Sequence, residues 1–270
     1  MQVYRGMDIG TAKPSAAQRA RLPHHLVDIV EPSRQFNAGE FVKSAESLLV
    51  EIRGRGKTPV VCGGTAFYIT SFLFGLPESP PGDPAVRERL RAMEREKGRR
   101  ALYETLRARD PEAASRIPPA DRYRILRALE ILETTGKSVF SFRWPRAPRG
   151  DHRFHVIGLQ RDRDELYRRI DARVDRMFAD GLVEEVKQLL ARGFGPGDPG
   201  MRGIGYREFL EMRAGCETIR QVRECIARNS RRYAKRQLTF FRSVPGVTWI
   251  DADDVEALRA SIGSALGPAT

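Results

Sequence analysis

Three consecutive residues, Gly63, Gly64 and Thr65, have the types and the spacing to receive a ligand. An apolar run, Thr58 to Cys62, precedes them and another, Ala66 to Leu73, follows. The pattern predicts a short buried strand, a glycine turn and a helix. The first N–H groups of such a helix point into the turn, and two glycines let a ligand approach the backbone closely. Thr65 is expected at the N-cap, although an ordinary capped turn has the same pattern.

A second candidate is the basic stretch Ile219 to Arg242, which has eight basic residues, one acidic residue and no Gly or Pro. It predicts one long helix. At about 100° per residue, one side carries the apolar residues Ile219, Val222, Ile226, Tyr233, Phe240 and Val244, and the opposite side carries Arg228, Arg231, Arg232, Lys235 and Arg242. The apolar face suits a core and the basic face suits anions, but solvated helix faces are often charged in the same way.

The composition indicates a polyanionic partner. Among 270 residues, 47 Lys and Arg stand against 35 Asp and Glu, which gives a formal charge of +12. Such a balance favours nucleic acid or phosphorylated substrates. Cys62, Cys216 and Cys225 form no metal-ligand pattern with the histidines, so we expect reduced thiols, no structural metal and a cytoplasmic location. No apolar run is long enough for a membrane span, and the first residues do not resemble an export signal.

Two proline-rich segments divide the chain. Residues 76–84 and 144–150 flank a stretch of short, charged helical patterns without a strand. We therefore expect three segments, 1–82, 83–150 and 151–270, in which an α/β core with a parallel sheet is interrupted by an all-helical insertion. The glycine-rich loop 193–205 is expected to touch a ligand.

The remaining predicted elements follow from periodicity and from helix start and stop signals. They are helices near Ala16 to Arg21, from Asn37 to about Gly54, Ala85 to Lys97, Arg99 to Arg109, Pro111 to Ile117, Asp121 to Thr135, Arg163 to Phe178, Leu182 to Leu190 and Val255 to Leu266, and strands from Phe154 to Leu159 and Val247 to Ile250.

Two segments imitate the phosphate-binding loop G-x-x-x-x-G-K-[ST] without fulfilling it. Gly56-Lys57-Thr58 would need a glycine at position 51, which is Glu51, and Gly136-Lys137-Ser138 would need one at position 131, which is Ile131. Both triplets fit the glycine that ends a helix. The 270 residues therefore contain no phosphate-binding loop of this type.

Six dispersed motifs together resemble one family. They are M-Q-V-Y-R-G-M-D-I-G-T-A-K-P at the start, G-G-T-A-F-Y from Gly63, D-P at Asp83, R-A-L-E from Arg127, G-Y at Gly205 and Y-A-K-R-Q from Tyr233. Their order and spacing are similar to those of the tRNA dimethylallyltransferases, the bacterial tRNA isopentenyltransferases, along nearly the whole chain.

The resemblance implies transfer of a dimethylallyl group from dimethylallyl diphosphate to N6 of the adenosine just 3′ of the anticodon. It also implies a core like that of P-loop NTPases, an insertion that grips the anticodon stem-loop, and Mg²⁺ as the ion that assists the diphosphate. No residue is assigned as a metal ligand. We expect a monomer.

Carried onto this sequence, the resemblance gives Thr65 a catalytic role at the reacting adenosine. The tRNA-binding residues would be Met1, Gln2, Arg87, Tyr123, Arg124, Ile125, Leu126, Arg127, Arg202, Gly203, Ile204, Gly205, Tyr206 and Arg207. The residues near the diphosphate or the substrate would be Gly63, Gly64, Arg231, Lys235 and Arg236.

The chemistry of such a reaction requires two features. A base inside an anticodon loop must leave its stack before its amine can attack carbon, so a basic surface and a pocket for the base are both needed. Departure of the diphosphate develops negative charge, which cations stabilise. We therefore expect the basic helix and the Gly-Gly-Thr turn to lie on the same side of the molecule.

One departure from the family pattern concerns the start of the chain. Family members carry a first strand, a phosphate-binding loop and an Asp thought to be the general base upstream of the point that matches Met1. We expect either a start codon placed too far downstream or a truncated form. The alternatives to the enzyme are a non-catalytic tRNA-binding remnant and a prenyltransferase or kinase that acts on a small nucleotide such as AMP.

These expectations give a first prediction. The 270-residue chain as written should transfer little or no prenyl group to tRNA, whereas a chain extended upstream should be active, because the extension would supply the phosphate-binding loop and the proton acceptor. Incorporation of labelled dimethylallyl groups measures both, and comparable turnover by the short form would contradict the prediction.

Overall fold

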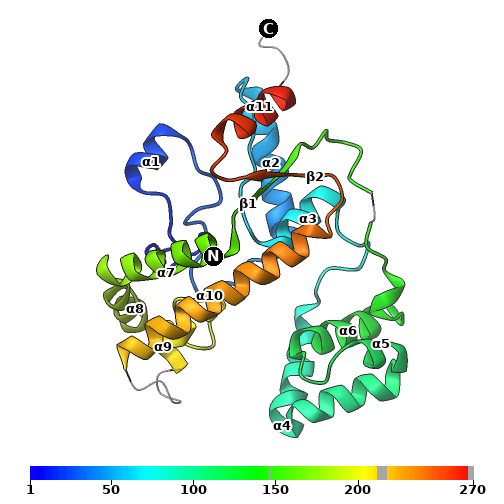
Figure 1. The fold of residues 1–270 in the computed structure, drawn as a ribbon. Coiled ribbons are helices and arrows are strands. Elements are labelled where there is room, and N and C mark those ends of the chain that lie inside the picture. Colours follow the sequence, from blue (N-terminus) through cyan, green and yellow to red (C-terminus); the bar gives the residue numbers. More distant parts are fainter. Residues whose placement is uncertain (146, 212–217, 267–270) are drawn as a thin grey trace. The chain divides into compact units, whose positions relative to one another are not determined.

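The structure is a computed structural model that describes residues 1–145, 147–211 and 218–266. The chain forms two compact units (Figure 1). Unit 1 comprises Met1–Thr70 and Arg153–Thr270, and unit 2 comprises Ser71–His152. The residue boundaries predicted for the insertion, 83 and 150, stay a prediction.

The sheet of unit 1 consists of two parallel strands, β1 (Val156–Gln160) and β2 (Val247–Asp251). They pair in register from Val156 opposite Val247 to Gln160 opposite Asp251. Gly158 is required there, because a Cβ at this position would lie 2.8 Å from the Trp249 ring of the neighbouring strand.

The predicted buried strand at Thr58 to Cys62 is wrong. This segment has no strand assignment, and Val60 and Val61 are 83% and 43% exposed. A strand forms only where a neighbour supplies its backbone hydrogen bonds, and the two-stranded sheet of the described residues does not reach these valines. Apolar residues alone therefore gave the wrong expectation.

The helices of unit 1 agree closely with the predicted segments, except for a short helix at Arg207–Glu211 that was not predicted. They are α1 (Ala16–Arg21), α2 (Ala38–Gly54), α3 (Ala66–Phe74, which continues into unit 2), α7 (Arg163–Ala179), α8 (Leu182–Ala191), α9 (Arg207–Glu211), α10 (Ile219–Arg242) and α11 (Val255–Leu266), with a 3₁₀ turn at Gly200–Arg202. Capping boxes start α2 at Asn37 and α10 at Thr218, which satisfies N–H groups that otherwise lack partners.

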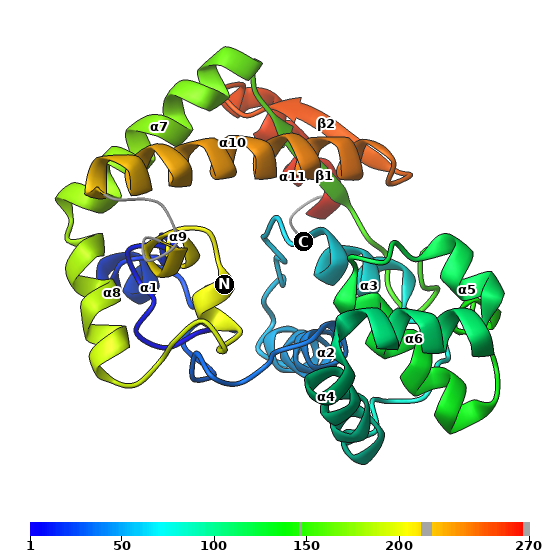
Figure 2. The ribbon, with the colours of Figure 1, turned by 90° about the horizontal axis from the view of Figure 1, so that it is seen from below.

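The basic helix α10 lies against α7 (Figures 1 and 2). Its Val222 and Ile226 are buried in a core that α7, α8 and the N-terminal loop also form. The apolar face was predicted to continue, but Tyr233 and Phe240 are 39% and 41% exposed. Only the first half of α10 faces this core, so the second half presents aromatic side chains on its surface.

The regular elements in the described part of unit 2 are all helices, as expected for the insertion. It contains α4 (Pro84–Arg109), α5 (Pro111–Arg116), α6 (Arg122–Thr135) and a 3₁₀ turn at Val139–Ser141. Gly98 interrupts α4 with a φ of 80°, which confirms the two predicted helical segments on either side of it. The core between α4 and α6 includes Leu90, Leu102, Ile125 and Leu129.

No helix in the described part of the chain has both the length and the apolar character that a membrane span needs. Cys62 and Cys225 carry no disulfide, and Cys216 lies outside the described residues.

The burial pattern of unit 2 gives a stability prediction. Leu102 is fully buried in its core, so Leu102→Ala should lower the free energy of unfolding by about 2–5 kcal/mol, through lost burial and the cavity left behind. Arg91→Ala, at an exposed position of the same helix, is the control and should change it by less than about 0.5 kcal/mol. Equal effects of the two substitutions in urea unfolding would contradict this description of the core.

Candidate functional site

The Gly-Gly-Thr turn is bound directly to the basic helix. The Gly64 carbonyl accepts hydrogen bonds from Nε2 of Gln237 at 2.6 Å and from the hydroxyl of Tyr233 at 3.4 Å. A Cβ on Gly64 would lie only 2.1 Å from Gln237 Nε2, so the close approach depends on a glycine. The structure thus brings together the two features that were expected to share one side.

Thr65 begins α3 with a hydroxyl that is available to a ligand. Its carbonyl accepts the N–H groups of Tyr68 and Ile69, which places Thr65 at the start of the helix as predicted. Its hydroxyl, however, makes no hydrogen bond with any described residue, so the expected capping bond is not formed. A Cβ on neighbouring Gly63 would meet nothing within 4 Å. One face of the turn is therefore open.

The cations of α10 differ in how fully they are neutralised. Arg231 forms an ion pair with Asp171 of α7. Lys235 and Arg236 have no carboxylate partner among the described residues, and the Arg236 guanidinium lies 5.7 Å from the centre of the Tyr233 ring. Lys235 and Arg236 also line a shallow hollow of about 510 Å³. These two are thus better placed than Arg231 to meet an external anion.

Met1 and Gln2, the N-terminal residues predicted to contact tRNA, make contacts with other residues of unit 1. Gln2 Nε2 donates to the carbonyls of Thr11 and Ala12, at 3.2 and 2.9 Å. The Met1 side chain packs on Gly203, where an added Cβ would lie 2.3 Å from the Met1 methyl group. The structure therefore places Met1 beside the glycine-rich loop.

A buried carboxylate joins the N-terminal loop to Tyr206. Glu185 Oε2 accepts the N–H groups of Asp8 and Ile9, at 2.8 and 2.7 Å, and Oε1 accepts the N–H of Gly10 at 3.1 Å and the Tyr206 hydroxyl at 2.7 Å. Burial and then the Glu185 charge raise the pKa of Tyr206, so Tyr206 stays a protonated donor. Four donors thus compensate one carboxylate without a cation.

A second buried carboxylate, Glu208, joins the glycine-rich loop to α10. Its Oε2 accepts the Gly205 N–H at 2.8 Å, and its Oε1 accepts Asn229 Nδ2 at 2.8 Å and Arg207 Nε at 3.0 Å. Arg202 donates to loop carbonyls instead, with its NH2 group 2.9 Å from the Gly197 oxygen. Ile204 packs against the core of unit 1. The segment 202–207 is therefore held rigidly, with Arg202 exposed.

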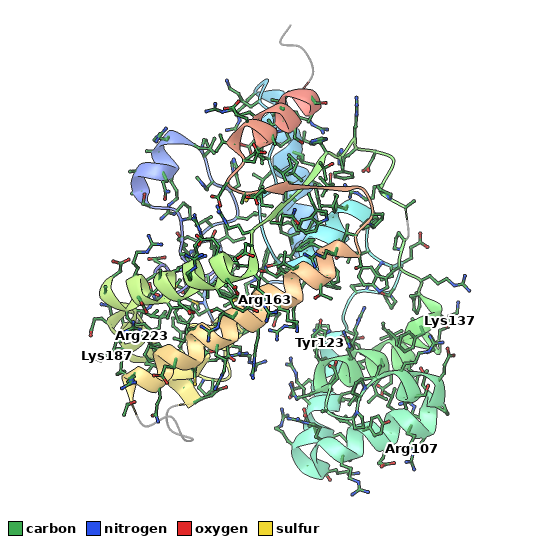
Figure 3. All side chains as sticks on the ribbon, in the orientation of Figure 1. Arg107, Tyr123, Lys137, Arg163, Lys187 and Arg223 are labelled. Atoms are coloured by element: carbon green, nitrogen blue, oxygen red, sulfur yellow. The ribbon has the colours of Figure 1, made fainter. Side chains whose placement is uncertain are left out.

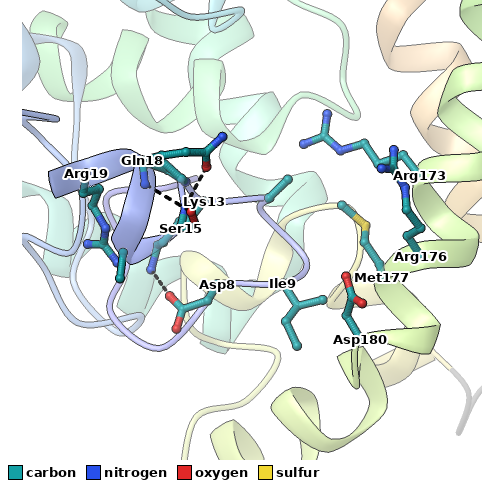
Figure 4. A pocket seen from close by; sticks show the side chains of 13 residues that line it. Asp8, Ile9, Lys13, Ser15, Gln18, Arg19, Arg173, Arg176, Met177 and Asp180 are labelled. Carbon is teal, nitrogen blue, oxygen red and sulfur yellow. Dashed lines mark hydrogen bonds and ion pairs between the residues drawn. The ribbon is translucent and has the colours of Figure 1, made fainter. Parts of the chain in front are cut away.

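A cavity of about 600 Å³ lies between the N-terminal loop, α1 and α7 (Figure 4). Asp8 in its wall is paired with Lys13 at 2.6 Å. Arg173 and Arg176 project from α7 toward it and have no acidic partner among the described residues. Desolvation and then the nearby Arg176 charge lower the pKa of Arg173, so the cationic form there lacks compensation.

Sequence reasoning missed Arg173 and Arg176. A signal for them was present, because Arg169, Arg173 and Arg176 recur at helical spacing in α7 and so share one face. Glu185, Glu208 and the Gln237 contact carry no such signal, since each depends on a partner that is distant in the sequence.

The predicted tRNA-binding residues of unit 2 fall into two groups. Tyr123 is 72% exposed (Figure 3), and the Arg124 side chain is 68% exposed beside Asp121 at 3.3 Å. Ile125 and Leu126 instead lie in the core, so their side chains pack and do not face solvent. Arg127 and Arg87 both donate to Glu130.

The residues around the turn do not fit a protein-held Mg²⁺. This ion prefers oxygen ligands and is usually bound through carboxylates. The two α10 side chains that contact the turn, Tyr233 and Gln237, are neutral, and the neighbouring Lys235 and Arg236 of the same helix are cationic. No chemical step is therefore assigned to an ion held by these residues.

The packing of Tyr206 gives a third prediction. A Cβ on Gly10 would lie 2.6 Å from Cζ of the fully buried Tyr206 ring, so Gly10→Ala should cost about 1–3 kcal/mol of stability through overpacking. Gly63→Ala, at an open position, is the matched control and should cost much less. Urea unfolding followed by tryptophan fluorescence compares the two, and an equal loss would contradict the proposed rigidity of the Tyr206 contact.

Comparison with known proteins identifies the family. The family model described as IPP transferase matches residues 2–244. The tRNA dimethylallyltransferase of Geobacter sulfurreducens is 46% identical over 258 residues, which cover 93% of this chain and 81% of the relative. That of Syntrophobacter fumaroxidans is 45% identical over 265 residues, covering 97% and 77%.

Solved structures agree with the sequence relatives. The crystal structure of the full-length tRNA isopentenylpyrophosphate transferase from Bacillus halodurans superposes with a TM-score of 0.66 at 39% identity, covering 98% of this chain and 84% of that one. A eukaryotic dimethylallyltransferase acting on tRNA gives a TM-score of 0.77 at 26% identity, with coverages of 96% and 69%. These likenesses confirm the predicted α/β fold class, and the chain belongs to the IPP transferase family.

Proposed function

We propose that this protein is a tRNA dimethylallyltransferase that modifies N6 of the adenosine 3′ of the anticodon. The observation that carries the proposal is the hydrogen bond from Gln237 of the cationic helix to Gly64, beside the unengaged Thr65 hydroxyl. The family membership and the names of its relatives support the same reaction. The formal charge of +12 favours tRNA over a small nucleotide.

The geometry suits an amine that attacks carbon. The N6 nitrogen forms a bond to the dimethylallyl carbon as the bond from that carbon to the diphosphate oxygen breaks, so negative charge develops on the leaving group. N6 loses one proton, which passes to water or to the departing diphosphate. The base must be extruded to reach the turn. The Thr65 hydroxyl, which has no partner among the described residues, can donate to or accept from the edge of that base.

The anionic leaving group needs cations, and two sets are available in unit 1. Lys235 and Arg236 line a hollow on α10, the helix that contacts the turn through Tyr233 and Gln237, and Arg173 and Arg176 line the cavity beside the N-terminal loop. Neither set has an acidic partner among the described residues. We assign the diphosphate to Arg173 and Arg176, because they line a cavity of about 600 Å³. Lys235 and Arg236 line the shallow hollow on α10, which suits the RNA backbone.

Three further parts complete the proposal. Dimethylallyl diphosphate is the donor, and Mg²⁺ enters as the counter-ion of that substrate. The tRNA partner is bound through its anticodon stem-loop by a monomer. The location is the cytoplasm, where tRNA is processed and where thiols such as Cys62 stay reduced.

Substitution of Thr65 tests the assignment of the base pocket. Thr65→Ala should lower kcat about tenfold to a hundredfold, because a hydrogen bond at the reacting base is lost, while affinity for an anticodon stem-loop changes little. Thr65→Ser should restore most of the turnover.

Thr70→Ala is the matched control, because the Thr70 hydroxyl in the same helix already bonds the Ala66 carbonyl at 2.9 Å. Turnover is measured by incorporation of labelled dimethylallyl groups, in whichever of the two chains of the first prediction is active. Wild-type turnover by Thr65→Ala would remove Thr65 from the site.

A further inference from the structure

Glu130 of α6 is a buried acid that lies beneath Arg87 and Arg127, two of the residues expected to bind RNA. Its side chain is 1% exposed. Its Oε2 atom accepts hydrogen bonds from Arg87 and from Arg127, each at 2.8 Å. Its Oε1 atom has no hydrogen-bond partner among the described residues. Leaving a buried carboxylate oxygen unsatisfied is costly, so the position requires an explanation.

The same carboxylate is interlocked with the loop before α4. Arg127 donates through its NH2 group to the Pro80 carbonyl at 2.6 Å and to the Ser79 hydroxyl at 3.4 Å. Gly82 is packed so tightly that a Cβ there would lie 2.6 Å from the Arg87 NH2 atom and 3.1 Å from Glu130 Oε1. Loop, acid and both arginines therefore form one fixed arrangement inside unit 2.

The two arginines are not equivalent within it. Arg127 is 23% exposed, and its NH1 and NH2 groups are both engaged by protein oxygens. The Arg87 side chain is 38% exposed and, among the described residues, makes a single hydrogen bond, the one to Glu130. A guanidinium has five N–H donors, so Arg87 keeps most of its donors for an outside acceptor. One carboxylate between two guanidiniums leaves one net positive charge.

We infer that Glu130 is a positioning residue that aims the Arg87 guanidinium at one phosphate of the bound RNA. Without the shared oxygen, the two cations would repel each other and the long Arg87 side chain would sample many rotamers. With it, Arg87 is fixed before RNA arrives, and less side-chain entropy is lost on binding. The inference rests on the proposed function, since it needs tRNA as the ligand.

The direction in which Glu130→Gln changes the affinity for RNA distinguishes a positioning role of Glu130 from a purely electrostatic one. Glu130→Gln removes a negative charge, so general electrostatics alone would make a polyanion bind more tightly. Positioning gives the opposite result, a loss of affinity for an anticodon stem-loop of about tenfold, which corresponds to one charge-assisted contact.

Glu133→Gln is the matched control. Glu133 lies on the same helix and also accepts from two arginines, Arg89 at 2.8 Å and Arg109 at 3.0 Å. Glu133→Gln also replaces a carboxylate by an amide, but at a position that does not contact Arg87. It should leave affinity unchanged or slightly increased.

Fluorescence anisotropy of a labelled anticodon stem-loop, titrated with the full chain at several salt concentrations, measures the binding. In a double-mutant cycle, Glu130→Gln should have no further effect once Arg87 is Ala, because the acid acts through that arginine. The slope of log K, the association constant for the stem-loop, against log salt concentration should also become less steep in Arg87→Ala. The expected change is about 0.7–0.9, the value for the loss of one phosphate contact.

Gly82→Ala provides a second variant that leaves every charge in place, and it should weaken binding by displacing Arg87. It also decides the matter if Glu130→Gln does not fold. Wild-type affinity in Gly82→Ala, a gain of affinity in Glu130→Gln, or additive losses in the cycle would overturn the inference. If the wild-type chain bound no stem-loop at all, the proposed function itself would fail.

Discussion

The candidate site of unit 1 depends on the contact between the Gly64 carbonyl and Gln237 of α10. Through it, a helix whose first half is fixed in a hydrophobic core presents its second half to an open turn. Because Val222 and Ile226 are buried, packing sets the position of α10, and this also fixes where the exposed cations of the helix lie. A site for a polyanion and a site for a single base are thereby placed together, as transfer to an RNA base requires.

Buried carboxylates organise the surrounding loops. Glu185 collects three successive backbone N–H groups and a tyrosine hydroxyl, and Glu208 ties the glycine-rich loop to α10. Such acids cannot remain buried unless donors compensate them, so each one fixes the backbone that supplies those donors. The proposed role of Glu130 in unit 2 is of the same kind, with guanidiniums as the donors. In this protein, acids shape surfaces that attract anions.

The sequence was sufficient for the elements whose signals are local. The α2 and α10 helices begin at capping boxes and show clear helical periodicity, and the break at Gly98 follows from that residue alone. Partners that lie far apart in the sequence, such as the neighbour of a strand or of a buried acid, could not be predicted from local signals. The apolar run that includes Val60 was taken for a strand because strand formation depends on a neighbour elsewhere in the chain. The same limit hid the Glu185 network and the two unpaired arginines of α7, and it left Arg231 assigned to an anion although Asp171 already pairs with it.

In the proposed site, the extruded base lies on the open face of the Gly-Gly-Thr turn, at the Thr65 hydroxyl and beside α10. Photocrosslinking tests it most directly, with an anticodon stem-loop that carries an azido-adenosine at the position 3′ of the anticodon and with peptide mapping of the products. Crosslinks to the segment 63–68 and to residues 233–237 of α10 are expected. Crosslinks confined to other segments, such as α1 or α11, would contradict it.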